Sequence, residues 1–199
     1  MRTLSVTAEN RDCLVREAAA ALLAGAVVVI PTDTVYGLAA HPASAEAVTR
    51  LGTIKGRPTG KPIALLAADL AAVRAFGARL DPTAQRLAQA FWPGGLTLVI
   101  PCGEKEEGFR VPAHAFCREL LAACGGVLRV TSANLSGAMP AVNAAQILAD
   151  NGLCADLLLD DGPSREGVAS TVVRTTPDGL AILRAGVLAE ADLRAAAGY

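Results

Sequence analysis

Apolar runs alternate with amphipathic stretches along most of the chain, which indicates an α/β fold. Residues 26–30 form a continuous apolar run between Gly25 and Pro31, and this run predicts a fully buried strand. Helix-forming residues over 8–24 carry one apolar face and predict a helix that Gly25 ends. The same patterns predict further strands over 62–66, 96–100, 127–130, 157–162, 170–174 and 180–184, a short extended segment over 109–112, and helices over 44–55, 69–76, 82–92, 115–123, 143–151 and 190–197.

A few residues indicate where these elements begin and end. Ser44 is a good N-cap for the helix that follows it, and Gly56 supplies a helix stop just before Pro58. Asp81 followed by Pro82 marks the start of another helix. The last two predicted strands lie so close in sequence that they form a hairpin, and the sheet is therefore expected to be mixed rather than purely parallel.

Composition and charge favour one globular domain over residues 1–199. The chain is 52% hydrophobic and 19% charged, with a mean hydropathy of +0.40, which describes a packed core rather than a disordered chain. A net charge of -1 argues against a protein wrapped in nucleic acid. Charged residues occupy the place of a signal peptide, and the apolar window 18–30 is too short to span a bilayer. We therefore expect a cytoplasmic protein without membrane contact.

Familiar metal and nucleotide motifs are absent from the sequence. The five cysteines form no C-x-x-C pair, the two histidines have no metal-ligand spacing, and His114 is expected near a helix cap rather than as a base. There is no G-x-x-x-x-G-K-[ST] phosphate loop and no G-x-G-x-x-G after the first strand. A nucleotide would therefore be bound by side chains on several strand ends.

Polar residues gather where predicted elements end. Thr32, Thr34 and Tyr36 follow the first buried strand and suit a ligand pocket, although a polar turn explains the same residues. Lys55-x-Arg57 straddles a helix stop, so its two cations can converge on a polyphosphate instead of pointing apart. The alternative for each of these cations is a solvated surface position.

Three later polar residues have the same two interpretations. Ser132 and Asn134 lie two residues apart in extended chain, so they face one way and could hold one ligand or cap a turn. Ser170 begins a later strand. Arg110 and Arg184 are further candidate cations for a phosphate or nucleotide.

Seven short motifs cover nearly the whole chain: Pro31-Thr32-Asp33-Thr34-x-Tyr36-Gly37-Leu38, Lys55-x-Arg57-Pro58-x-x-Lys61-Pro62, Trp92-Pro93-Gly94-x-Leu96-Thr97, Arg110-x-Pro112, Thr131-Ser132-Ala133-Asn134-x-Ser136-Gly137, Ser170-Thr171-Val172 and Ile182-Leu183-Arg184-x-Gly186. In this order and spacing, from about residue 10 to 187, they resemble the YrdC-type L-threonylcarbamoyladenylate synthase family. The resemblance implies a twisted mixed α/β sheet, a YrdC-like fold whose concave face holds the active site, in the family's single-domain form.

The resemblance also implies an activity and partners. Members of the family convert L-threonine, bicarbonate and ATP, with Mg²⁺, into threonylcarbamoyl-AMP and diphosphate. A separate threonylcarbamoyl transferase complex then modifies the adenosine beside the anticodon of certain tRNAs. That complex, and direct contact with tRNA, are therefore expected partners.

Site roles follow from the resemblance for the residues that match its motifs. Lys55 and Arg57 are the expected catalytic residues, because they would hold the triphosphate and stabilise the leaving diphosphate. Nucleotide or phosphate binding is expected of Lys55, Arg57, Arg110, Ser132, Asn134, Ser170 and Arg184, and threonine binding of Thr32, Thr34, Tyr36 and Lys61. Mg²⁺ is expected to arrive with ATP, without protein metal ligands.

Three positions depart from the family's pattern. Lys61 stands where two-domain members often have His, Ala185 where many have Pro, and Arg174 where Asp is common. Two other functions also fit the sequence. One is an RNA-binding YrdC-like protein without synthase activity, and the other is a look-alike enzyme that uses another carbamoyl substrate.

Overall fold

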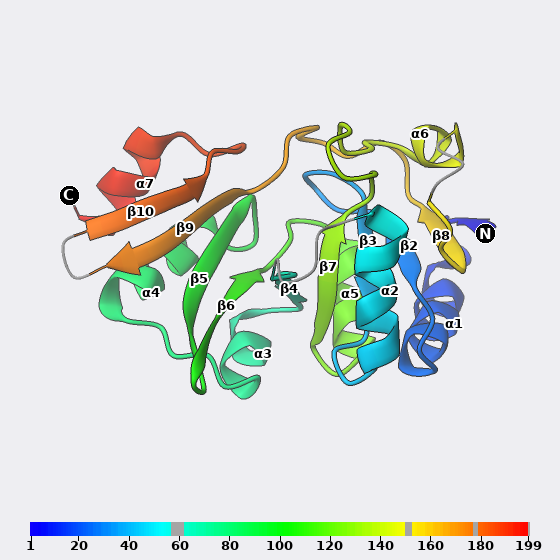
Figure 1. Cartoon of the computed structure of the whole chain (residues 1–199), viewed down its shortest axis with the longest axis horizontal. Coiled ribbons are helices and arrows are strands. Elements are labelled where there is room, and N and C mark those ends of the chain that lie inside the picture. The colour runs from blue at the N-terminus through cyan, green and yellow to red at the C-terminus, as the bar shows by residue number, and fades with distance from the viewer. Residues whose placement is uncertain (57–61, 150–152, 177–178, 199) are drawn as a thin grey trace.

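The computed structural model describes residues 1–56, 62–149, 153–176 and 179–198, and in these ranges it has one ten-stranded sheet and seven helices (Figure 1). The strands are β1 (Arg2–Ser5), β2 (Val28–Ile30), β3 (Gly37–Ala40), β4 (Leu65–Ala67), β5 (Leu96–Cys102), β6 (Lys105–Arg110), β7 (Val127–Ser132), β8 (Leu157–Asp160), β9 (Thr171–Thr176) and β10 (Gly179–Arg184). The helices are α1 (Arg11–Leu23), α2 (Ala45–Lys55), α3 (Leu70–Ala75), α4 (Pro82–Phe91), α5 (Ala115–Ala123), α6 (Ala144–Ala149) and α7 (Glu190–Ala197). No helix in the described ranges is long and apolar enough to cross a membrane.

The sheet is mixed, as the sequence predicts. Its strand order is β1-β8-β2-β3-β7-β4-β6-β5-β9-β10. The neighbours β1 and β8, β8 and β2, β4 and β6, and β5 and β9 run parallel, while the other neighbours run antiparallel. The predicted terminal hairpin is present as β9 and β10. Crossovers therefore bring residues distant in sequence onto one surface.

The helices leave part of one sheet face uncovered. In β2, Val28 and Ile30 pack toward α1 and α5, whereas Val29 packs toward α2 and α6, as does Val27 just before the strand. Farther along the sheet, α3, α4 and α7 pack on one face of β5 and β9. Figure 1 shows α2 in front of β2 and β3, with no helix in front of β5, β6 and β9. The candidate site lies on this helix-free face.

Local capping signals act as predicted. The Ser44 hydroxyl accepts from the backbone N–H of Ala47 at 3.3 Å, and Gly56 ends α2 with φ +59°. The Asp81 carboxylate caps α4, and Pro82 is its first residue. His114 is the N-cap of α5, where its Nδ1 accepts from the N–H of Cys117.

The sequence does not predict β1 or β3, the extended segment expected over 109–112 overlaps β6 only at the last two residues of that strand, and other bounds differ. Residues 37–40 are expected to belong to the polar segment after the first strand and not to form a strand of their own. In the structure they form β3, which pairs antiparallel with β2. Strand β1 consists mostly of exposed polar residues at the sheet edge, so it lacks the apolar pattern of a buried strand. The strand expected over 62–66 begins only at Leu65. Residues 57–61, 150–152, 177–178 and 199 lie outside the described part of the chain.

Candidate functional site

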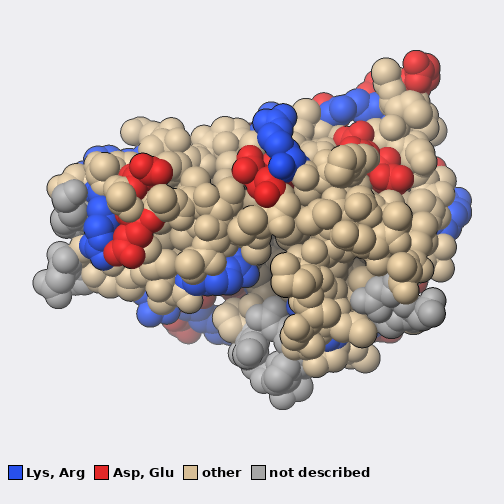
Figure 2. Space-filling view, turned by 90° about the horizontal axis from the view of Figure 1, so that it is seen from above, with Lys and Arg blue, Asp and Glu red and all other residues tan. Residues whose placement is uncertain are grey.

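A cavity of about 810 Å³ lies on the helix-free face of the sheet. Its wall comes from the 32–37 segment, the end of α2, the strands β4 to β7, and the β9–β10 hairpin. The charged lining residues are Lys55, Lys105, Glu106, Arg110, Arg174 and Arg184. Seen from above in Figure 2, blue cationic side chains lie beside a hollow at the lower side of the molecule, the side that faces the viewer in Figure 1. The cavity is thus markedly cationic in a chain whose net charge is -1.

Strand alternation explains which residues reach this cavity. Leu96, Leu98 and Ile100 of β5 are buried in the helix-covered core, while Thr97 and Val99 line the cavity.

A β-bulge modifies the pattern in β10. Ile182 pairs with Val173 but Arg184 pairs with Val172, so Leu183 is an extra residue in the ladder. Two consecutive side chains, Leu183 and Arg184, therefore line the cavity.

Lys55 lies at the end of α2 and is only 7% exposed. Its Nζ lies within hydrogen-bond distance of the carbonyl oxygens of Ser132 (2.6 Å) and Asn134 (3.0 Å). The same Nζ lies 3.0 Å from the Ser132 hydroxyl and 2.6 Å from Oδ1 of Asn134. Because an ammonium has only three protons, these four acceptors already exceed its donors. The Lys55 ammonium therefore holds the end of β7 in place at the cavity wall.

The Asn134 amide closes the loop that follows β7. Its Nδ2 donates to the carbonyl oxygens of Leu135 at 2.8 Å and Ala138 at 2.7 Å. Ser132 lines the cavity, and Asn134 is absent from its lining residues. The two side chains do face one group, as their spacing suggests, but in this structure that group is Lys55.

Arg110 and Asp33 form a buried ion pair at the inner end of the cavity. Their side chains are 6% and 4% exposed, and Arg110 Nη2 donates to Asp33 Oδ1. Arg110 also donates from Nη1 to the hydroxyl of Thr34 at 2.6 Å and from Nε to the carbonyl of Gly94 at 2.9 Å. Burial lowers the pKa of Arg110, and the carboxylate of Asp33 opposes that effect. The five N–H groups of a guanidinium leave two donors for a ligand after these three contacts.

The two threonines beside Arg110 share a hydrogen-bond network. The Thr32 hydroxyl donates to the carbonyl of Val35 at 2.6 Å and lies 3.1 Å from the hydroxyl of Thr34. Both threonines are buried and line the cavity. The Thr34 hydroxyl oxygen therefore accepts from Arg110, and its proton can be donated either to the Thr32 hydroxyl or to a ligand.

Tyr36 lines the cavity, but its hydroxyl is bound elsewhere. The hydroxyl donates to the carbonyl of Gly162 at 2.6 Å and accepts from the N–H of Asp161 at 3.3 Å. Burial raises the pKa of Tyr36. Its phenol thus ties the 32–37 segment to the loop after β8.

Ser170 connects three strands at the middle of the cavity. Its hydroxyl lies 2.8 Å from that of Thr97, and Arg184 Nη2 donates to it at 3.0 Å and to its carbonyl at 2.7 Å. Gly186 lies so close to residues 169–171 that an added Cβ would overlap their backbone. The Arg184-x-Gly186 motif and the Ser170-Thr171 motif are therefore one packed unit.

The structure brings most predicted site residues around one cavity. Lys55, Arg110, Thr32, Thr34, Tyr36, Ser132, Ser170 and Arg184 line it. Arg57 and Lys61 lie outside the described residues, although Lys55 and Pro62 on either side of their segment both line the cavity. Sequence reasoning does not identify Asp33, Thr97, Glu106 and Arg174 as site residues. Thr97 belongs to a quoted motif and could have been found from that signal, while Glu106 lies in no motif.

Within the described part of the chain, no group of three or more His, Cys, Asp or Glu residues could hold a metal ion. Cys117 and Cys124 are buried, and burial raises the pKa of the Cys117 thiol to about 12 and of the Cys124 thiol to about 11. His114 lies 3.6 Å from Asp161, and burial lowers its pKa. These groups are not among the lining residues of the cavity.

The twisted mixed sheet and its cationic cavity define a YrdC-like α/β protein. Residues 20–186 match the Sua5/YciO/YrdC family model, which is described as "Telomere recombination", and the chain belongs to this family. A threonylcarbamoyl-AMP synthase of Bacillus subtilis is 33% identical over 95% of this chain and 58% of its own length. A putative threonylcarbamoyl-AMP synthase of Mycobacterium tuberculosis is 35% identical over 89% of this chain and 86% of its own length.

Solved structures agree with the family assignment. Pyrococcus abyssi Sua5 in complex with L-threonine has a TM-score of 0.90 and 30% identity, and the match covers 99% of this chain and 60% of that chain. Escherichia coli YciO has a TM-score of 0.84 at 23% identity, with 97% and 98% coverage, and shows the shared fold. This chain therefore spans less than two thirds of the Bacillus and Pyrococcus proteins but most of the Mycobacterium protein and YciO.

Proposed function

We propose that this chain is a threonylcarbamoyl-AMP synthase, which makes threonylcarbamoyl-AMP and diphosphate from L-threonine, bicarbonate and ATP. The observation that carries the proposal is the position of Arg110. The guanidinium of Arg110 is almost completely buried beside Thr34 and has two N–H donors left for a ligand. It lines the same cavity as Lys55, Ser132 and Arg184. Relatives named threonylcarbamoyl-AMP synthase and the threonine complex of the Pyrococcus protein support the same activity.

The Arg110 end of the cavity suits an amino acid. A fork of two N–H groups matches the two oxygens of an α-carboxylate, and charge-assisted contacts of this kind are strong when water is excluded. Thr34 lies in direct contact with the guanidinium, so its hydroxyl would face the same amino acid. We therefore assign Arg110 to threonine rather than to the phosphate or nucleotide role expected from the sequence, with Thr32 and Thr34 beside it. The Tyr36 phenol would act by anchoring this segment.

The Lys55 end suits phosphate. Since four acceptors surround an ammonium with three protons, a phosphate oxygen can replace one of them without leaving a proton unbound. Arg57 would add a forked contact, and Ser132 would offer its hydroxyl. Arg184 and Ser170 would hold the ribose or the α-phosphate near the middle of the cavity.

Positioning and charge stabilisation would supply the catalysis. The threonine amine and a carbon dioxide equivalent form a carbamate, and its carboxylate displaces diphosphate from the α-phosphorus of ATP. The protein's part is to hold the carbamate in line with that phosphorus and to stabilise the charge that develops on the leaving diphosphate. Lys55 and Arg57 would do the latter.

Mg²⁺ would enter with the nucleotide. Magnesium is usually held by one or two carboxylates together with substrate phosphates and waters. Glu106, on β6, is the one carboxylate among the cavity's lining residues in the described ranges. The triphosphate itself would therefore provide most of the ligands, and the ion would neutralise charge on the β- and γ-phosphates.

We further propose that residues 1–199 act as one YrdC-like domain in the cytoplasm. Its product would pass to a threonylcarbamoyl transferase complex that acts on tRNA, and direct contact between this chain and tRNA is a separate proposal. The net charge of -1 gives no general basic surface for such contact.

Product formation tests the activity. The purified chain is incubated with ATP, Mg²⁺, bicarbonate and isotope-labelled L-threonine, and nucleotides are analysed by mass spectrometry. We expect labelled threonylcarbamoyl-AMP, which disappears when either threonine or bicarbonate is omitted. A labelled adenylate without the carbamate carbon, or a product formed only with another amine, would identify a look-alike enzyme. No adenylate with any of these substrates, together with submicromolar tRNA binding that weakens steeply with salt, would favour the RNA-binding alternative.

A further inference from the structure

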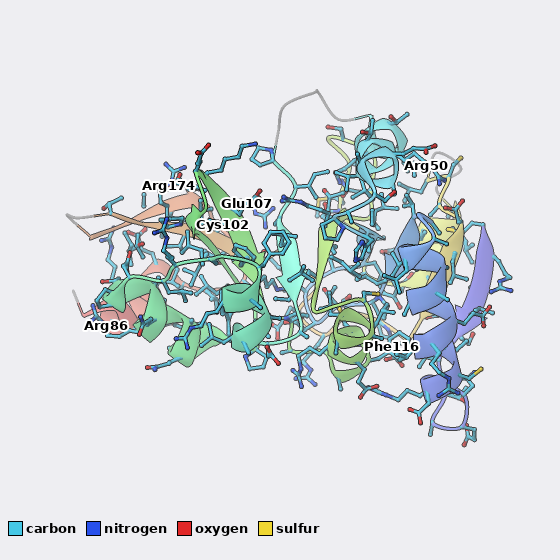
Figure 3. All side chains as sticks on the ribbon, turned by 90° about the horizontal axis from the view of Figure 1, so that it is seen from below. Arg50, Arg86, Cys102, Glu107, Phe116 and Arg174 are labelled. Atoms are coloured by element: carbon cyan, nitrogen blue, oxygen red, sulfur yellow. The ribbon has the colours of Figure 1, made fainter. Side chains whose placement is uncertain are left out.

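The outer end of the cavity carries a charged pair that neither the triphosphate nor the amino acid uses. Arg174 of β9 and Glu106 of β6 both line the cavity, and Nη2 of Arg174 lies 2.9 Å from Oε2 of Glu106. Their strands flank β5, where Val99 pairs with Arg174 and Pro101 pairs with Glu106. Figure 3 labels Arg174 on β9, next to the part of the sheet that β5 and β6 form.

Glu106 is unusual in this cavity because its side chain is negatively charged. It is the one acidic side chain among the described lining residues, whereas Lys55, Lys105, Arg110, Arg174 and Arg184 are cationic. A phosphate beside Glu106 would meet a like charge, so the phosphates belong nearer to Lys55 and Arg184. A carboxylate accepts hydrogen bonds and cannot donate while it is ionised. The ligand group that reaches Glu106 must therefore be a donor.

Arg174 offers a donor next to that acceptor. Its Nε is buried and has no hydrogen-bond partner among the described residues, while Nη2 is engaged by Glu106. Exposed ion pairs contribute little to stability, and both side chains here are more than 40% exposed. Folding stability therefore does not explain why this pair is present. A buried N–H without an acceptor is costly, and a ligand acceptor placed there would remove that cost.

The lining between this pair and the phosphate end is apolar. Val99, Val172 and Leu66 form it, with Ala64 beside them. Gly108 lies among them without a side chain, so nothing rises from β6 at this point. Such a surface suits one face of a planar heterocycle, since mostly apolar walls with a few placed polar groups are typical of ligand sites.

We propose that Glu106 and Arg174 recognise the edge of the adenine base of ATP, with the base on the Val99–Gly108–Val172 floor. Adenine presents its N6 amino donor next to a ring-nitrogen acceptor, and Glu106 beside Arg174 presents an acceptor next to a donor. Guanine and hypoxanthine instead present the O6 acceptor where adenine has its amine, so that atom would face the Glu106 carboxylate. This pair would therefore select adenine nucleotides, and the assignment rests on the proposed ATP-dependent function.

Equilibrium binding of ATP and ITP tests this assignment without requiring turnover. Calorimetric titrations are made on the wild type and on Glu106→Gln, Glu106→Ala and Arg174→Ala, with Glu104→Gln as the matched control. Glu104 is exposed in the turn between β5 and β6 and is not among the cavity's lining residues. Thermal midpoints establish that each variant is folded.

We expect the wild type to bind ATP about 10- to 100-fold more tightly than ITP, which corresponds to about 1.4 to 2.8 kcal/mol. Glu106→Gln and Glu106→Ala should reduce this ratio roughly tenfold, because a glutamine amide can donate to O6 and alanine no longer repels it. Arg174→Ala should weaken ATP binding about fivefold or more, and Glu104→Gln should change neither quantity.

An ATP/ITP ratio that is unchanged in the folded Glu106 and Arg174 variants would overturn the base assignment. If diphosphate is still released with threonine in that case, the synthase function stands and only this inference fails. Selective ATP binding that depends on Glu106, without any threonine-dependent diphosphate release, would support the base site and contradict the synthase. Absence of ATP binding by the wild type would overturn both.

Discussion

The guanidinium of Arg110 contacts the carboxylate of Asp33 beneath the cavity, and both side chains are almost completely buried. Asp33 is additionally fixed through its backbone, because its carbonyl accepts from the N–H of Glu166 at 2.9 Å. The loop that joins β8 to β9 thereby supports the segment that orients Arg110. A buried carboxylate on one side leaves the guanidinium rigid, with its remaining donors available to a ligand.

Removal of Asp33 should destabilise the fold. Asp33→Ala leaves the buried charge of Arg110 without its partner, and we expect the free energy of unfolding to fall by about 3 to 5 kcal/mol. Denaturant titration measures this change. The control is Asp12→Ala, at an exposed position in the first turn of α1, which should cost less than about 1 kcal/mol. Equal losses in the two variants would show that the ion pair does not stabilise the fold.

Arg110→Lys should separate the two possible roles of this cation. Lysine keeps the positive charge but cannot form a forked contact with a carboxylate. We expect KM for threonine to rise about 10- to 100-fold, while KM for ATP changes much less. Steady-state kinetics with each substrate varied in turn measures both constants. A rise confined to KM for ATP would return Arg110 to the phosphate or nucleotide role expected from the sequence.

Gly186 should be intolerant of even a methyl group. In Gly186→Ala the new Cβ would overlap the backbone of residues 169–171, so we expect a loss of about 1 to 3 kcal/mol and reduced activity through displaced Ser170. Gly52 provides a matched control, because it lies inside α2 and a Cβ added there would meet no atom of a neighbouring element within 4 Å. Gly52→Ala should raise stability by about 0.5 to 1 kcal/mol. Thermal midpoints that shift in the same direction would contradict this packing.

The sequence predicts most of the fold because its signals are local. Caps such as Ser44 and Asp81, and the apolar run before Pro31, depend on neighbouring residues and appear in the structure as expected. Strand β3 escapes prediction because Gly37–Ala40 is short and follows a polar segment, so its burial comes from pairing with β2 and β7. Sequence periodicity does not report such long-range pairing.

The site is predictable at the level of motifs and less so at the level of contacts. Residue types and spacing indicate that Lys55 and Ser132 serve a polar site, and both line the cavity. That Lys55 binds the end of β7 depends on a contact 77 residues apart in sequence. Glu106 and Arg174 belong together only because β5 lies between their strands, which no local pattern indicates.

Arg57 should be important for turnover rather than for stability. Arg57→Ala removes a charge-assisted contact to phosphate worth about 2 to 3 kcal/mol, so we expect activity to fall about 30- to 150-fold. Arg57→Lys should restore only part of that loss. Diphosphate release and thermal midpoints of the wild type and both variants measure the effect. Turnover that is unchanged in Arg57→Ala would show that Arg57 does not contact a phosphate of ATP during the reaction.

Threonine-dependent release of diphosphate from ATP tests the central claim most directly. The purified chain is assayed with ATP, Mg²⁺ and bicarbonate, in the presence and absence of L-threonine, with L-valine as the isosteric amino acid that lacks the hydroxyl. The proposed function predicts diphosphate release that requires L-threonine and is much slower with L-valine. Diphosphate at or below the level of the control without threonine would contradict it.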